Sequence, residues 1–212
     1  MLVIQKFVLG PVATNAYLIA DTDTEDAVVI DPGGEGHIIV RAAEERGWQI
    51  HQIWLTHAHF DHIGGVADVV DGSESVQVGL HPDDIPLWKH KGGATFFGMD
   101  VDPGPEPTLE FQHGQMLQIG NHKFEVRHTP GHTLGHVIFY CKAEGLLFSG
   151  DVIFQWSIGR TDLPGGDFNT LMNSISQQVL TLPNETRILS GHGPETSVGE
   201  ERRENPYVGL RR

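Results

Sequence analysis

The densest group of side chains that could do chemistry lies in the segment THAHFDH, residues 56–62. Its four potential metal ligands are His57, His59, Asp61 and His62. The apolar run 50–55 before it predicts a strand, from whose end His57 and His59 would point the same way, because alternate residues of an extended chain share a face. A helix that begins directly afterwards would send Asp61 and His62 in another direction. One short segment can therefore serve two metal ions.

Three further candidate ligands lie far along the chain, each beside a glycine: His132 in TPGH, Asp151 in SGD and His192 in SGHG. Glycine permits the sharp turn that exposes a side chain at the end of a strand. The chain has 13 histidines, so clusters could arise from composition alone. Seven nitrogen and oxygen ligands at strand ends are nevertheless typical of a metal site. We expect His136 to lie in the core or at the surface, with support of a ligand as the alternative.

The ligand types indicate which metals and which reaction to expect. Imidazole and carboxylate without thiolate suit Zn²⁺, with iron or manganese as alternatives. Two ions roughly 3.5–4 Å apart can share a hydroxide with a pKa of about 7, which needs no serine or cysteine nucleophile to attack a carbonyl. The sequence therefore predicts two divalent metal ions and a hydrolase.

Short strands and helices surround these motifs. The sequence pattern predicts a helix over residues 36–46 and another over residues 168–182, capped by Asp167. A short helix should follow the histidine motif over residues 63–70, and residues 91–107 read as a long loop that could act as a lid. The predicted strands cover residues 2–9, 17–20, 27–30, 50–55, 76–80, 116–119, 123–127, 137–140, 146–148 and 187–189. The alternation lacks a strict βαβ rhythm and favours sheets covered by helices, which is an α+β architecture.

Composition narrows the class of protein. A chain of 212 residues suggests one domain, or at most two small ones. Its single cysteine, Cys141, permits no internal disulfide. The N-terminus lacks the pattern of a signal peptide and no apolar run reaches the length of a membrane span, so we expect a cytoplasmic protein. The net charge of −14 argues against a nucleic-acid partner, which requires a basic surface.

The pattern of His57, His59, Asp61, His62, His132, Asp151 and His192 resembles that of the metallo-β-lactamase superfamily, from Asp31 in VIDPGG to Pro206. The resemblance implies a single domain over residues 1–212, an αββα four-layer sandwich with the metal site at the edge of its two central sheets. It implies that His57, His59 and His132 hold the first metal ion. It also implies that Asp61, His62 and His192 hold the second ion and that Asp151 bridges the two. Asp61 and Asp151 would then be catalytic, with Asp61 also orienting the hydroxide.

Other segments resemble the single-domain, glyoxalase II-like hydrolases of bacteria. They are SIGRTDLPGGD at residues 157–167, FGMD at residues 97–100 and the tail from Gly191 to Pro206. The implied substrate is S-D-lactoylglutathione, a thioester cleaved to D-lactate and glutathione, so the implied enzyme is a hydroxyacylglutathione hydrolase. Larger glyoxalase II enzymes add a C-terminal glutathione-binding domain, for which we expect no room here. A related glutathione thioester, or a broader thioesterase activity, is therefore the alternative.

Several assignments stay open at this point. Arg160 either clamps a glutathione carboxylate or pairs with Asp162, and Phe97 either contacts substrate or belongs to the core. Asp31 is expected to hold the histidine loop in place.

The runner-up activity is that of persulfide dioxygenases, which share a similar Gly-Arg-Thr-Asp loop and would use one iron at His57, His132 and Asp151. Hydrolysis of β-lactams is not expected, because β-lactamases are exported and do not use an aspartate like Asp151 as a bridge. A non-enzymatic metal-binding module is a third option, and the sequence does not indicate an oligomeric state.

Overall fold

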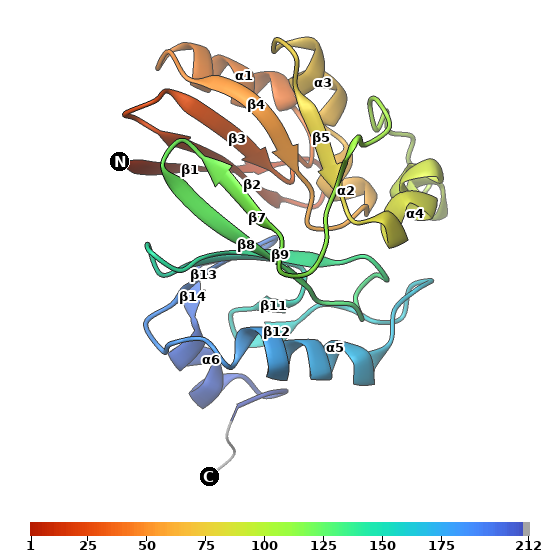
Figure 1. Ribbon diagram of the computed structural model, residues 1–212. Helices are drawn as coiled ribbons and strands as arrows, with labels where there is room; N and C mark the ends of the chain where they lie inside the picture. The colour runs from red at the N-terminus through yellow and green to blue at the C-terminus, as the bar shows by residue number, and fades with distance from the viewer. Residues whose placement is uncertain (210–212) are drawn as a thin grey trace. The chain divides into compact units, whose positions relative to one another are not determined.

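The computed structural model describes residues 1–209 (Figure 1). The chain divides into two compact units, one of residues 1–111 with 118–122 and the other of residues 112–117 with those from 123 onward. Each unit has an apolar core of its own. The helices and mixed sheets confirm the predicted α+β class.

The first unit is built on a six-stranded sheet. Its strands follow in chain order across the sheet: β1 (Leu2–Leu9), β2 (Thr14–Asp21), β3 (Asp26–Ile30), β4 (Gln49–Trp54), β5 (Gln77–Leu80) and β6 (Leu109–Glu110). The pairings from β1 to β3 are antiparallel and those from β3 to β6 are parallel. The strands β2 and β3 are almost entirely buried, as their near-continuous apolar sequences require.

Two helices, α1 (Gly36–Glu44) and α3 (Val66–Asp71), cover one side of this sheet (Figure 1). Most apolar residues of α1 are buried, and Arg41 faces solvent. Ile38 is an exception, because its side chain is 41% exposed, whereas Val40 packs in the core. The helix predicted over residues 63–70 is in fact two helices, because α2 (Phe60–Ile63) ends at Gly64 before α3 begins.

Three short helical segments follow β5: η1 (Pro82–Asp84), α4 (Ile85–Lys89) and η2 (Lys91–Phe97). The prediction of a loop over residues 91–107 was wrong for its first part, because residues 91–97 form the 3-10 turns of η2. Gly92 and Gly93 interrupt these turns with φ angles of 64° and 76°, which is why no helical period was visible in the sequence.

The second sheet has the order β14-β13-β10-β9-β8-β7. Its strands are β7 (Met116–Ile119), β8 (His122–His128), β9 (Val137–Cys141), β10 (Leu146–Gly150), β13 (Arg187–Ser190) and β14 (Thr196–Ser197). β10 and β13 are parallel neighbours, whereas β8, β9 and β10 pair antiparallel. A separate small hairpin joins β11 (Ile153–Phe154) to β12 (Ser157–Ile158).

The second unit carries α5 (Phe168–Ser174), its π-helical continuation η3 (Ile175–Val179), and α6 (Val198–Glu204). The predicted cap is confirmed, because the carboxylate of Asp167 accepts a hydrogen bond of 2.7 Å from the Thr170 N–H. Four apolar residues of this predicted helix are buried, namely Leu171, Ile175, Val179 and Leu182. Met172 is half-buried and Phe168 is 49% exposed. Helix α6 was not predicted from the sequence.

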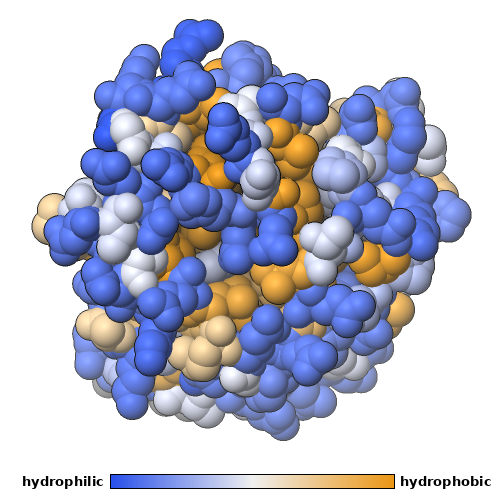
Figure 2. All heavy atoms as spheres, turned by 45° about the horizontal axis from the view of Figure 1, so that its top comes forward, coloured by the Kyte–Doolittle hydropathy of each residue, from blue (hydrophilic) through white to orange (hydrophobic). Residues whose placement is uncertain are grey.

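The surface is largely polar on the face that Figure 2 shows, with hydrophobic residues forming patches between hydrophilic ones. Within residues 1–209, every helix is too short or too polar to cross a membrane.

Candidate metal centre

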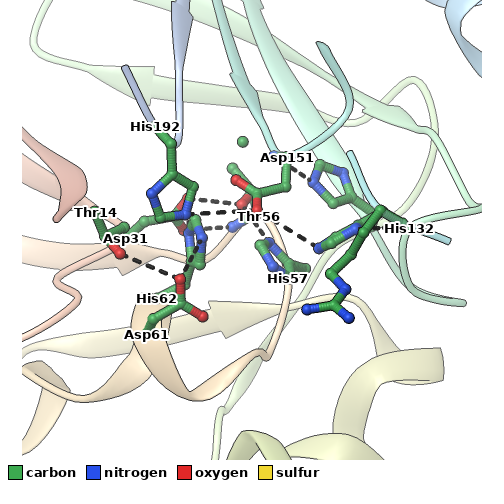
Figure 3. Close-up of polar contacts among 12 residues, drawn as sticks. Thr14, Asp31, Thr56, His57, Asp61, His62, His132, Asp151 and His192 are labelled. Atoms are coloured by element: carbon green, nitrogen blue, oxygen red, sulfur yellow. Dashed lines mark hydrogen bonds and ion pairs between the residues drawn. The ribbon is translucent and has the colours of Figure 1, made fainter. Parts of the chain in front are cut away.

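The first unit gathers three histidines of the THAHFDH segment at the carboxyl end of β4, and Figure 3 labels His57 and His62 among them. The ring of His57 lies 4.8 Å from that of His59 and 4.1 Å from that of His62, measured between centroids. All three imidazoles are buried, and Asp61 beside them is nearly so. The predicted ligands of this segment therefore form one cluster within their unit.

Asp31, at the end of β3, determines where two of these imidazoles carry their protons. Its carboxylate accepts hydrogen bonds from the Thr56 N–H at 2.7 Å, the Thr56 hydroxyl at 2.6 Å and His62 Nδ1 at 3.0 Å. A carboxylate can only accept here, so His62 is protonated on Nδ1 and has a lone pair on Nε2. The Thr56 hydroxyl gives its proton to Asp31 and must accept from His57 Nδ1 at 3.0 Å. In the neutral form of both imidazoles the lone pair is thus on Nε2, the atom with which histidine can bind a metal ion.

Asp61 lies against the same group. Its Oδ2 accepts a hydrogen bond of 3.2 Å from the Thr14 hydroxyl and lies 3.6 Å from His62 Nε2. Both of these atoms present lone pairs, so a cation near them would relieve their repulsion. The backbone also approaches closely, because a Cβ atom on Gly33 would overlap the carbonyl oxygen of Asp61. This contact explains why the DPGG turn requires glycine.

The segments η1 and η2 also support the backbone of the THAHFDH segment. The buried carboxylate of Asp84 accepts a hydrogen bond of 3.0 Å from the N–H of Ala58. A Cβ atom on Gly92 would overlap the backbone of Ala58 and Phe60. The Phe97 ring is 5.3 Å from the Phe60 ring, although Phe97 remains 46% exposed. The sequence analysis missed Asp84, whose only local signal is the HPDD turn.

The second unit brings its three predicted ligands together. Asp151 and His192 follow β10 and β13, which are parallel neighbours and so end at one edge of the sheet. His132 lies in the loop between β8 and β9. His132 Nε2 and His192 Nε2 each lie 3.6 Å from Asp151 Oδ2. Two imidazole nitrogens thus converge on one carboxylate oxygen (Figure 3).

The tautomer of His132 is set by the main chain. Its Nδ1 lies 2.7 Å from the carbonyl oxygen of Arg160, which can only accept a hydrogen bond, so Nδ1 is protonated. The Nε2 lone pair therefore faces the carboxylate of Asp151. Such an arrangement suits a cation held between the two groups.

His136 combines two of the roles that the sequence had left open. Its side chain is buried in the core, and its Nε2 accepts a hydrogen bond of 3.1 Å from the N–H of Asp151. Its Nδ1 is 3.1 Å from the Thr129 hydroxyl. His136 is a core residue that also holds a predicted ligand in place, and its position four residues after His132 was the available signal.

Arg160 pairs with Asp162, which was one of its two predicted roles. The guanidinium Nε and Nη2 each donate a hydrogen bond of 2.8 Å to the two carboxylate oxygens, although both side chains are mostly exposed. The Arg160 hydrogen bond lowers the pKa of Asp162 to about 2. A contact between Arg160 or Phe97 and substrate remains a prediction.

The chain matches a known family over most of its length. A family model described as the metallo-β-lactamase superfamily matches residues 9–192. The chain belongs to the metallo-β-lactamase superfamily. The imidazole and carboxylate donors of each unit fit the divalent ions that this superfamily binds.

Two relatives of this chain are named as hydrolases. It is 42% identical to the probable metallo-hydrolase YqgX of Bacillus subtilis, over 96% of both chains. It is 37% identical to the hydroxyacylglutathione hydrolase GloC of Haemophilus influenzae, over 92% of both chains. These relatives support an enzyme and confirm the predicted resemblance to glyoxalase II-like proteins.

Two solved structures share the metallo-β-lactamase fold with this chain. One is described as the B3 metallo-β-lactamase BLEG-1, with 40% identity, a TM-score of 0.88 and coverage of 97% of this chain and 99% of that one. The other is TTHA1623 in a di-iron-bound form, with 40% identity, a TM-score of 0.88 and coverage of 96% and 100%. The predicted fold is therefore confirmed.

Proposed function

We propose that this protein is a cytoplasmic thioesterase that hydrolyses S-D-lactoylglutathione or a related glutathione thioester with two divalent metal ions. The observation that carries the proposal is the convergence of His132 and His192 on Asp151 Oδ2. A carboxylate placed in this way can be shared by two ions. The relative named as a hydroxyacylglutathione hydrolase supports the choice of substrate.

The ligand assignment follows the family resemblance. His57, His59 and His132 would hold the first ion, Asp61, His62 and His192 would hold the second, and Asp151 would contribute to both. Zinc suits these donors, with iron or manganese as alternatives. The di-iron form of TTHA1623 supports the iron alternative.

The chain's own residues prepare the site for hydrolysis. When bound, the ions supply Lewis acidity for the thioester carbonyl and lower the pKa of the attacking water. Asp31 keeps His57 and His62 protonated on Nδ1, so that their Nε2 atoms are ligands. Asp61, whose Oδ2 already accepts from the Thr14 hydroxyl, orients the attacking water. Arg160 and Phe97 contact the substrate.

Metal analysis and two activity assays test this proposal. Protein made in metal-replete medium should contain about two ions per chain and should cleave S-D-lactoylglutathione, seen as loss of thioester absorbance. Because one structural relative is described as a β-lactamase, a β-lactam must be assayed in parallel. Cleavage of the β-lactam without cleavage of any thioester would refute the proposal.

The substitution His192→Ala separates the hydrolase from a one-iron persulfide dioxygenase. In the hydrolase, metal content should fall from about two to about one ion per chain, and activity by on the order of a thousandfold. In the dioxygenase, His192 would not bind the iron and its loss would cost roughly 10–100-fold at most. Retention of one iron, together with oxygen consumption by the parent protein on glutathione persulfide, would replace our assignment.

A further inference from the structure

A buried carboxylate on α6 lies outside the chemistry proposed above. Glu201 is fully buried and accepts hydrogen bonds from three segments of the second unit. The Thr196 hydroxyl donates to its Oε1 at 2.5 Å. The Trp156 N–H and the Asn205 side-chain amide donate to its Oε2 at 2.9 Å and 2.7 Å. Burying a carboxylate costs free energy unless donors hydrogen-bond to it, as three donors do here. A buried carboxylate with this arrangement of donors therefore calls for a specific role.

The hydrogen bonds of Glu201 fix the tip of the β11–β12 hairpin. Trp156 lies in the turn of this hairpin with a left-handed φ of 58°. Its N–H is held by Glu201, and the carbonyl oxygen of the next residue, Ser157, accepts a 3.0 Å hydrogen bond from the same Asn205 amide. The indole N–H of Trp156 also donates to the neighbouring Glu200 at 3.1 Å. Helix α6 therefore anchors the turn on both sides.

The other end of this hairpin reaches all three predicted ligands of the unit. Asp151 lies two residues before the start of β11, and a Cβ atom on Gly159, directly after β12, would overlap the carbonyl oxygen of Asp151. The carbonyl oxygen of the next residue, Arg160, accepts the proton of His132 Nδ1. Within the hairpin, the Phe154 ring contacts the His192 ring edge to face, with centroids 6.0 Å apart.

We propose that Glu201 is a positioning residue for metal binding, which acts through the β11–β12 hairpin on His132, Asp151 and His192. The inference rests on the proposed function only in requiring that these three residues bind metal. Its physical basis is that one carboxylate accepts from three donors, and no apolar side chain could hold the hairpin tip at the same point.

The test compares three substitutions on α6. Glu201→Met keeps the volume but removes every acceptor. Glu201→Gln can still accept from Trp156 and Asn205 through its oxygen, while its amide donates to the Thr196 hydroxyl. Glu204→Met makes the same change at an exposed position of the same helix. Cobalt(II) is titrated into each metal-free protein, and both affinity and the visible absorption spectrum are measured where circular dichroism shows the protein folded.

We expect Glu201→Met to weaken cobalt binding about tenfold or more and to alter the spectrum, as substitutions behind metal ligands do. Glu201→Gln and Glu204→Met should stay within about twofold of the parent protein. If Glu201→Met does not fold, Asn205→Ala takes its place, since it removes the link to Ser157 and should weaken binding in the same direction.

Two results would overturn the inference. One is unchanged cobalt affinity and spectrum in folded Glu201→Met, or in Asn205→Ala if the former does not fold. The other is an equal loss in Glu201→Gln, which would mean that charge rather than geometry matters. A parent protein that binds no cobalt would refute the proposed function as well, whereas failure on every thioester would refute that function alone.

Discussion

At the scale of single residues, the protons of the candidate site are placed by groups that are not themselves ligands. His62 donates to the Asp31 carboxylate, His57 to the Thr56 hydroxyl and His132 to the Arg160 carbonyl oxygen. In each case the partner leaves Nε2 as the atom that could bind a metal ion. The partner of His132 is a main-chain atom, so that contact survives any substitution of the Arg160 side chain.

Arg160→Ala should therefore leave metal content unchanged. If the guanidinium also contacts a substrate carboxylate, KM should rise about tenfold while kcat changes little, because uniform binding is lost. Steady-state kinetics and metal analysis measure both. Loss of metal or of folded protein would instead show that the pair with Asp162 is structural.

The substitution Arg160→Ala should also change the pKa of Asp162. The pKa of Asp162 lies at about 2 because Arg160 hydrogen-bonds to it, so the pair's contribution to stability is complete above the ordinary aspartate pKa and is lost as pH falls through about 2. In Arg160→Ala the Asp162 pKa should return towards its ordinary value. Carbon-13 NMR titration of the carboxyl measures it. The Asp167 carboxyl, whose pKa is lowered by Thr170, is the internal control and should not move.

At the scale of elements, the histidine loop is held by backbone that passes too close for any side chain. Gly33 contacts the carbonyl of Asp61, and Gly92 at the start of η2 contacts the backbone of Ala58 and Phe60. Close approach of this kind leaves the loop little freedom, because protein interiors yield little to added volume. The short segments around the site therefore act as supports for the ligands.

Gly92→Ala tests this support. Its methyl group would meet backbone atoms and its φ of 64° would be strained, so the free energy of unfolding should fall by about 2–4 kcal/mol. Gly98→Ala is the matched control: its φ is 68° but nothing lies within 4 Å of the added methyl, so only about 1 kcal/mol should be lost. Denaturant unfolding of the metal-free proteins measures both values. Equal losses would show that the contact at Gly92 carries no weight.

At the scale of the whole molecule, bound metal should contribute to stability. Ions that bind the folded chain and not the unfolded one stabilise it by mass action. At ion concentrations of about 100 times the Kd, a chelator should lower Tm by roughly 5–10 °C. Thermal melts with and without chelator measure the shift, and His192→Ala should show a smaller one. An unchanged Tm in the parent protein would contradict metal binding by the folded state.

The seven candidate ligands, the family and the longer elements could all be predicted from the amino-acid sequence. Ligand types and their spacing are local properties, and the apolar period over residues 168–182 is visible without a partner. Helix α6 was missed because its buried residues are Val198, Gly199 and Glu201, which make no apolar stripe.

The residues that hold the candidate ligands in place became visible only in the folded chain. Asp31 lies 25 residues before Thr56, Asp84 lies 26 after Ala58, and Glu201 lies 45 after Trp156. The partner that a buried carboxylate or imidazole finds depends on which donors the fold brings within hydrogen-bond distance, and no local pattern encodes that. His136 illustrates the limit: its sequence context indicates burial, but its bond to the Asp151 N–H exists only once β9 and β10 are paired.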